Sequence, residues 1–206
     1  MAKRTEEQEQ VISVSKVPRR ELRKMLRRWR LLDLDEWEPL GGCVTLSAGT
    51  PGLRLYDEDF DADVRKDVEG RLTEAARLFA MELEVAEPLH IVSDGHWPIT
   101  GSRDEATSIP AQLTALSGIT RAFGGAIRVD SLTRDQLQQL MEELTRETAY
   151  ARCDCSVILA ILGSHVVWSP CHHGDIHVYT DGNQAVIARL RDVASALGLS
   201  ISHGSL

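Results

Sequence analysis

Three predicted strands follow one another late in this chain, and their order limits the fold more than any other feature. The segments are Cys155–Leu162, His165–Trp168 and Ile176–Thr180. Earlier in the chain, predicted strands and helices alternate. This mixture favours an α+β fold with a mixed, largely antiparallel sheet over a doubly wound parallel sheet. We expect three or four helices to pack with that sheet, in addition to a basic amphipathic helix near the N-terminus.

Apolar residues at helical spacing predict the long helices. One is expected over 61–84, and another begins near Thr133, where Gln136 three residues later completes a capping-box signature. A last helix follows a turn at 181–183 and ends before Gly198. The other expected elements are a hairpin of Cys43–Ser47 with Leu53–Tyr56, strands at Leu89–Val92, Ala126–Val129 and Leu199–Ser202, and a helix over 110–121.

The first thirty residues carry a charge opposite to that of the rest of the chain. Ten Lys and Arg stand there against four Glu, a net charge of +6, whereas residues 31–206 have a net charge of −14. After Pro18, apolar residues recur at helical spacing among the basic ones: Leu22, Met25, Leu26 and Trp29. We therefore predict a flexible N-terminus and basic helical arm over 1–40, and an α+β globular domain over 41–206.

A basic amphipathic helix can bind an acidic protein, nucleic acid or an anionic membrane surface. Because the rest of the chain is acidic, nucleic acid could be bound only through the arm, and a membrane is not an expected partner. Two interpretations stay open: the apolar side of the helix docks on its own domain, or it docks into the groove of a partner protein. A homo-oligomer is also open. The predicted partner-binding residues are Arg19, Arg20, Arg23, Arg27, Trp29 and Arg30.

Thiol and imidazole side chains are concentrated between Cys153 and His177. This stretch holds three of the four Cys and four of the seven His, and both side chains are common zinc ligands. The CxC spacing is tighter than the usual CxxC, so buried thiols beside a polar histidine loop are an alternative, and redox chemistry is a third. We expect either no cofactor or zinc. The candidate ligands are Cys153, Cys155, Cys171, His172 and His173.

Hairpin geometry divides this cluster. A two-residue turn at Gly163-Ser164 would place residue 160 opposite residue 167, and Cys153 and Cys155 would share one face. Cys171 would join them only where Pro170 breaks the strand. His177 would lie opposite Val167, on the same face as His165. The prediction is therefore one group of zinc ligands with two histidines elsewhere.

The sequence contains none of the common catalytic motifs, neither a nucleophile elbow nor a Walker loop, GxGxxG or HExxH. We expect a non-enzymatic protein that binds or regulates a partner, either inside a larger complex or by neutralising another protein. The alternative is a zinc-binding domain or a zinc-dependent enzyme. No apolar run reaches eighteen residues and the N-terminus has no apolar leader, so a bacterial cytoplasmic protein is expected.

Overall fold

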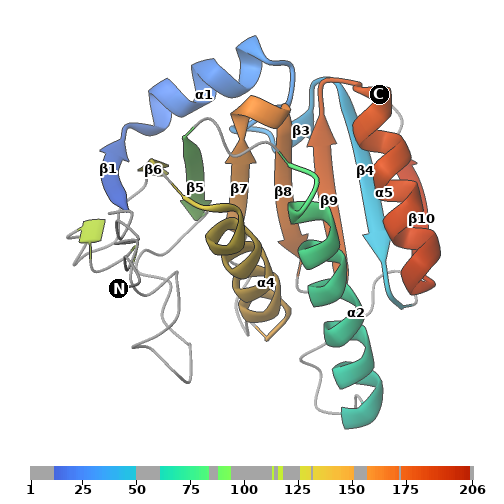
Figure 1. The fold of residues 1–206 in the computed structure, drawn as a ribbon. Coiled ribbons are helices and arrows are strands. Elements are labelled where there is room, and N and C mark those ends of the chain that lie inside the picture. Colours follow the sequence, from blue (N-terminus) through green and yellow to red (C-terminus); the bar gives the residue numbers. More distant parts are fainter. Residues whose placement is uncertain are drawn as a thin grey trace, which may run out of the picture.

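The structure, a computed structural model, describes residues 12–49, 61–83, 88–93, 113, 116–117, 126–130, 132–150, 157–171 and 173–204. In this part of the chain one large sheet has the strand order β1-β6-β5-β7-β8-β9-β4-β10 (Figure 1), and each neighbouring pair is antiparallel. Its strands are β1 (Ser13–Val17), β4 (Gly42–Ser47), β5 (Leu89–Ser93), β6 (Ala126–Asp130), β7 (Val157–Ile161), β8 (Val166–Cys171), β9 (Asp175–Thr180) and β10 (Ser200–Gly204).

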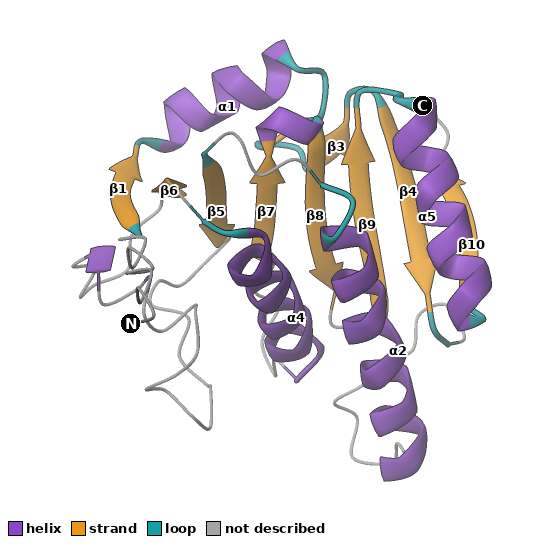
Figure 2. Ribbon diagram, viewed as in Figure 1, coloured by secondary structure: helices purple, strands orange, loops and turns teal. Residues whose placement is uncertain are grey.

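Helices pack on both faces of this sheet, as Figure 2 shows. The helices α2 (Ala62–Ala80), α4 (Arg134–Tyr150) and α5 (Gln184–Leu197) cover one face and enclose the main core. The helix α1 (Arg19–Arg28) packs on the opposite face with a small ribbon of β2 (Leu32–Asp33) and β3 (Glu38–Pro39). The predicted α+β class is confirmed.

Because side chains alternate along each strand, the same strands contribute apolar residues to the cores on both faces of the sheet. Leu159 and Ile161 of β7 face the three helices, whereas Ile158 and Ala160 face α1, because successive side chains point to opposite sides of a strand. Trp168 is the largest fully buried side chain on the three-helix side. Its indole N–H donates to the Thr145 hydroxyl at 3.2 Å, so the polar edge of this buried ring is hydrogen-bonded.

The predicted signals for helix ends are confirmed. The Thr133 backbone N–H donates to Gln136 Oε1 at 2.9 Å, and the Gln136 N–H donates to Thr133 Oγ1 at 3.2 Å. These reciprocal bonds satisfy donors that the first turn of α4 leaves without helical partners. Gly198 follows α5 with a φ of 62°, the left-handed conformation in which glycine commonly ends a helix.

Three predictions differ from the structure or fall partly outside the described residues. Residues 13–17, expected within a flexible N-terminus, form the edge strand β1, where Val14 is paired with Val129 of β6. That pairing joins residues far apart in sequence, and no local pattern indicates it. β4 is present where the hairpin was expected, but it pairs with β9 and β10, and Leu53–Tyr56 lies outside the described residues. Most of the expected helix over 110–121 also lies outside them.

Candidate functional site

The apolar side of α1 is buried against its own sheet. Leu22 and Leu26 are both completely buried, one turn apart on the helix. They belong to a second core with sheet residues such as Ala160 and Val167. This packing agrees with the first interpretation of the arm, docking on its own domain, because Leu22 and Leu26 are not accessible to a partner's groove.

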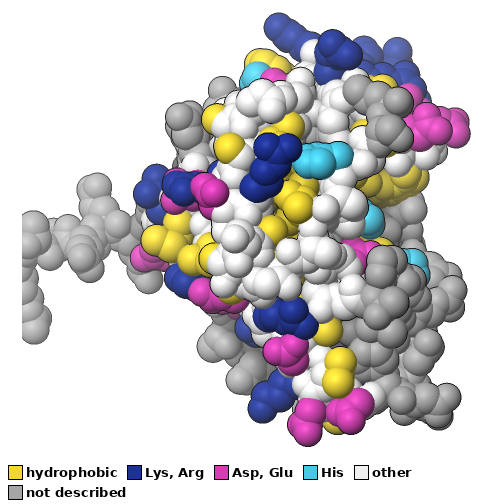
Figure 3. Space-filling model, turned by 90° about the vertical axis from the view of Figure 1, so that its right-hand side faces the viewer, with side chains coloured by type: hydrophobic (Ala, Val, Ile, Leu, Met, Phe, Trp, Pro, Cys, Tyr) yellow, Lys and Arg dark blue, Asp and Glu magenta, His cyan; other side chains and the backbone are white. Residues whose placement is uncertain are grey.

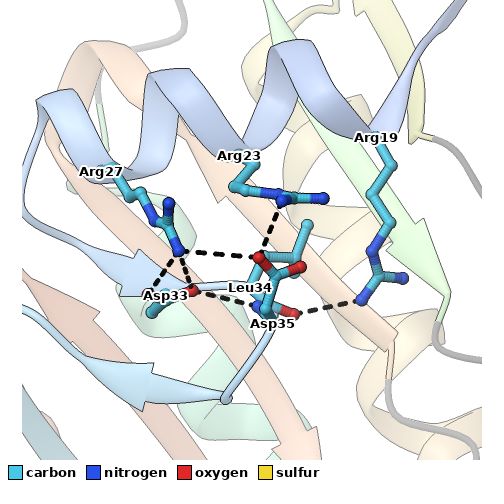
Figure 4. A network of polar contacts seen from close by, with 6 residues as sticks. All are labelled: Arg19, Arg23, Arg27, Asp33, Leu34 and Asp35. Carbon is cyan, nitrogen blue, oxygen red and sulfur yellow. Dashed lines mark hydrogen bonds and ion pairs between the residues drawn. The ribbon is translucent and has the colours of Figure 1, made fainter.

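Three arginines on one side of α1 bind the chain segment that follows the helix, as Figure 4 shows. The Arg19 guanidinium donates to the Leu34 carbonyl oxygen at 3.1 Å. Arg23 forms an ion pair with Asp35 at 2.9 Å, and Arg27 forms one with Asp33 at 2.8 Å. A hydrogen bond from the Asp35 backbone N–H, helped by Arg27, holds the pKa of Asp33 below its usual range. These three predicted partner-binding residues therefore have intramolecular partners.

The side of α1 that points away from the buried leucines is a basic surface. Arg20, Lys24 and Arg28 are spaced by four residues, so they lie along one side of the helix, and all three are exposed. Their side chains make no hydrogen bond or ion pair with any other residue that the structure describes. Figure 3 shows Lys and Arg side chains gathered at the top of the molecule, the end where α1 lies. We call these three residues the α1 basic row.

The end of α1 is fixed by a contact between Trp29 and His165. The two ring centroids are 4.1 Å apart, and His165 Nδ1 is 2.6 Å from an Asp181 carboxylate oxygen. Arg30, the last predicted partner-binding residue, has a φ of 54°. Next to it, a Cβ on Gly41 would lie 2.6 Å from the Arg30 carbonyl oxygen, so only glycine allows this close backbone approach. Trp29 is thus an anchor within the chain.

A second polar region lies on the α1 side of the sheet, on β4, β8 and β9. Pairing places Ser169, His177 and Thr45 in one row across the three strands. Cys171, Asp175 and Ser47 form the next row on the same face. The side chains of His177 and Thr45 meet directly, with 3.0 Å between His177 Nδ1 and Thr45 Oγ1. Burial lowers the pKa of His177, which favours the neutral ring.

Cys171 and His173 meet at the turn between β8 and β9. The Sγ atom of Cys171 is 3.2 Å from Nδ1 of His173, and both residues are partly exposed. The turn itself is closed by the Gly174 N–H, which donates to the Cys171 carbonyl oxygen at 3.2 Å. We call the two side chains the Cys171–His173 pair.

Two of the predicted zinc ligands are therefore brought together, and the other three, Cys153, Cys155 and His172, lie outside the described residues. Among the residues that are described, no group of three Cys, His, Asp or Glu side chains could hold a metal ion. The zinc hypothesis stays a prediction.

The predicted hairpin register is correct, but two of its consequences are wrong. Ala160 pairs with Val167 as expected, although the connection is a 3-10 turn over Leu162–Ser164, not a two-residue turn. Pro170 does not break β8, because it stays in the ladder opposite Ile176. Strict alternation therefore continues, and His177, which lies opposite Ser169 and not Val167, shares the face of Cys171. His165 leaves the strand in a left-handed conformation, with a φ of 52°.

Sequence reasoning overlooked several groups on this face. Thr45 and Tyr179 have no motif around them, and only sheet pairing brings them beside the Cys and His residues. Burial, with smaller contributions from Cys43 and Cys171, raises the pKa of Tyr179 to about 12. Burial also raises the pKa of the Cys43 thiol. Alternation along β9 was the one available signal, because it puts Asp175, His177 and Tyr179 on one face.

Comparison with known proteins finds no matching family model, no matching curated protein and no matching solved structure. The candidate sites are therefore interpreted from their own geometry. No helix in the described part of the chain is both long and apolar enough to span a membrane.

Proposed function

We propose that this chain is a non-enzymatic binding or regulatory protein that attaches to an acidic partner protein through the α1 basic row. The observation that carries the proposal is the division of α1 into three sides. Its apolar side is buried, Arg23 and Arg27 on a second side are paired with Asp35 and Asp33, and Arg20, Lys24 and Arg28 on a third side are exposed. The docked helix thus holds Arg20, Lys24 and Arg28 in fixed positions, where they can bind acidic side chains of a partner.

Electrostatics favour an acidic protein as the partner. The chain as a whole has a net charge of −8, so the net positive charge of residues 1–30 is an exception within an acidic protein. A long polyanion such as nucleic acid would extend past α1 and meet the repulsion of the acidic body. A compact acidic surface can cover the basic row alone. Charge complementarity of this kind mainly sets the association rate and the choice of partner.

Charge reversal on α1 tests the proposal. The triple variant Arg20→Glu, Lys24→Glu, Arg28→Glu is compared with a control triple variant carrying the same charge change elsewhere, Lys66→Glu, Arg134→Glu, Arg191→Glu. All six positions are exposed. Binding to a fluorescently labelled poly-glutamate peptide is measured by anisotropy at 25 mM and 250 mM salt. Proteins captured from the native host are then compared between wild type and the two variants.

The wild type and the control variant are expected to bind the peptide, and to release it as salt rises, because exposed charges are screened over about 10 Å at 0.1 M. The α1 variant is expected to lose the peptide and the host protein that the control retains. Equal binding by all three proteins would contradict the proposal. Tighter binding to a 20-base-pair DNA duplex than to the peptide, lost in the α1 variant, would reassign the basic row to nucleic acid.

Zinc binding is a second candidate, favoured by the 3.2 Å separation of Cys171 Sγ and His173 Nδ1. A thiolate and an imidazole that share a tetrahedral zinc ion lie about 3.5 Å apart. Cys171 and His173 would be two of the four ligands, and the other two would have to come from Cys153, Cys155 or His172. Elemental analysis of the purified full-length protein decides this candidate. About one equivalent of zinc, lost in Cys171→Ser, would support it, and zinc-free protein would end it.

A further inference from the structure

The strand β10 forms one open edge of the large sheet. It is the last strand in the sheet order, so among the described strands only β4 pairs with it. Four of its five residues are exposed, and the fifth, Ile201, is partly exposed. An edge strand presents a row of backbone N–H and C=O groups with which a further strand can pair. The edge at β10 is therefore able to take up one more strand.

The two edges of the sheet differ in how they are protected. The other edge strand, β1, carries Lys16 in an exposed position, and a lysine on an edge strand opposes pairing with another strand. β10 has the sequence SISHG, without Lys or Pro, and its register with β4 runs through all five residues without a bulge. Figure 3 looks onto the side where β10 lies, and white atoms, the colour of backbone and uncharged polar side chains, cover much of its middle. β10 is thus the less protected edge.

The strand is complementary to a second copy of itself. Antiparallel pairing over all five residues would put a twofold axis at Ser202, so that Ser202 lies opposite its own copy and Ile201 lies opposite His203. Ile201 packs against the main core, and His203 Nε2 is 3.3 Å from the Arg191 guanidinium of α5, so both lie on the α5 face. Pairing would cover the partly exposed Ile201 and would place no like charges opposite each other on the strands.

The position of α5 fits this pairing. The helix packs over both β4 and β10, as Figure 1 shows. Neighbouring strands are about 4.8 Å apart, so the axis of α5 would stand about 5 Å from the twofold axis. The two copies of α5 would then lie about 10 Å apart, which is a distance at which helices pack. A second copy paired with β10 therefore brings the helices into contact and not into collision.

The side of α5 that would face the twofold axis carries small residues. Arg191 marks this side, since it contacts β10, and Ala188 and Ser195 lie three and four residues from it on the same side. α5 and β10 run in opposite directions, and a strand advances about twice as far per residue as a helix, so the axis at Ser202 passes α5 near residue 193. Arg191 would then lie opposite the Ser195 of the other copy. A serine there leaves room for the arginine.

We propose that this protein forms a symmetric homodimer in which β10 of one copy pairs antiparallel with β10 of the other and joins the two eight-stranded sheets into one. The dimer is expected to be weak. β10 and the facing side of α5 supply about ten residues from each copy, whereas a standard interface uses about 20–30, so we expect a dissociation constant in the micromolar range.

Sedimentation velocity of the full-length protein at about 1–300 µM measures the association. The wild type should shift from monomer to dimer over this range. Ser202→Lys would put two lysines opposite each other at the twofold axis, and it should raise the dissociation constant at least about ten-fold because like charges in contact are unfavourable. The matched control is Ser13→Lys, the same change at an exposed position on β1, and it should dimerise like the wild type.

A mixture of Ser202→Lys and Ser202→Glu distinguishes a lost interface from a misfolded variant. Each variant alone should be monomeric at a concentration where the wild type is dimeric. Mixed together, the two should form a heterodimer, since the lysine and the glutamate face each other only where residue 202 lies opposite its own copy. A variant that had failed to fold would not regain association. A mixture that stays monomeric would overturn the placement of the axis at Ser202.

A wild type that remains monomeric at about 300 µM would overturn the proposal, as would a dimer that Ser202→Lys leaves intact. Species that grow beyond the dimer with concentration, and that Ser13→Lys abolishes, would overturn it in favour of head-to-tail pairing between β10 and β1. None of these variants touches the α1 basic row. The dimer can therefore fail without affecting the partner-binding proposal, and the reverse also holds.

Discussion

His90 should make the stability of this protein fall between pH 7 and pH 5. The side chain lies on β5 and is 4% exposed, and its Nδ1 atom has no hydrogen-bond partner among the described residues. Desolvation, helped by the charge of Arg128 on the neighbouring strand and opposed by Asp130, lowers the pKa of His90 from 6.5 to about 4. Between these two pKa values, His90 is therefore protonated in the unfolded chain but mostly neutral in the folded protein.

The direction and the size of the stability change follow from this difference between the folded and unfolded pKa of His90. Because the pKa is lower in the folded state, the full stability is present above pH 6.5 and is lost as the pH falls towards 4. At pH 5 the unfolded chain is protonated at His90 and the folded chain is mostly not, which removes about 2 kcal/mol, and the loss approaches about 3 kcal/mol below pH 4. Carboxyl groups such as Glu74, whose pKa is lowered by Arg77, reduce the stability mainly at pH values below 5.

Urea denaturation at pH 7.5 and pH 5.0, followed by tryptophan fluorescence, measures the effect in the wild type and in His90→Gln. Glutamine cannot take up a proton, so the loss of unfolding free energy between the two pH values should shrink by about 2 kcal/mol in the variant. A contribution from His177, whose pKa is also lowered, remains in both proteins and cancels. His203→Gln, at an exposed position, is the control. An unchanged pH dependence in His90→Gln would refute the reasoning.

Two further predictions concern packing, and both are read from urea midpoints at pH 7.5. Gly41→Ala should destabilise the fold by at least about 2 kcal/mol, since its Cβ would stand 2.4 Å from the Thr180 carbonyl oxygen, whereas Gly70→Ala, with nothing within 4 Å, should stabilise α2 by about 0.5–1 kcal/mol. Equal effects would contradict the close approach at Gly41. Leu26→Ala should cost about 2–5 kcal/mol because Leu26 is completely buried between α1 and the sheet, and a loss below about 0.5 kcal/mol would mean that α1 is not docked on the sheet.

Much of the local structure could be predicted from the sequence, because local structure follows from residues close together in the chain. The capping box at Thr133 and the glycine after α5 are signals carried by a few neighbouring residues. The register of β7 with β8 was predictable for the same reason, since a short turn connects the two strands. The alternation that makes β9 two-sided is a property of any strand.

The candidate sites depended on pairing between distant segments. Thr45 meets His177 only because β9 lies between β8 and β4, and 132 residues separate the two side chains. The sequence marks Cys171 and His173 as reactive types, but the turn after β8 decides which histidine reaches the sulfur. The basic character of α1 was likewise readable from its residues. Only the burial of Leu22 and Leu26 against the sheet decides which of its charges face solvent, because hydrophobic burial joins surfaces without regard to their separation along the chain.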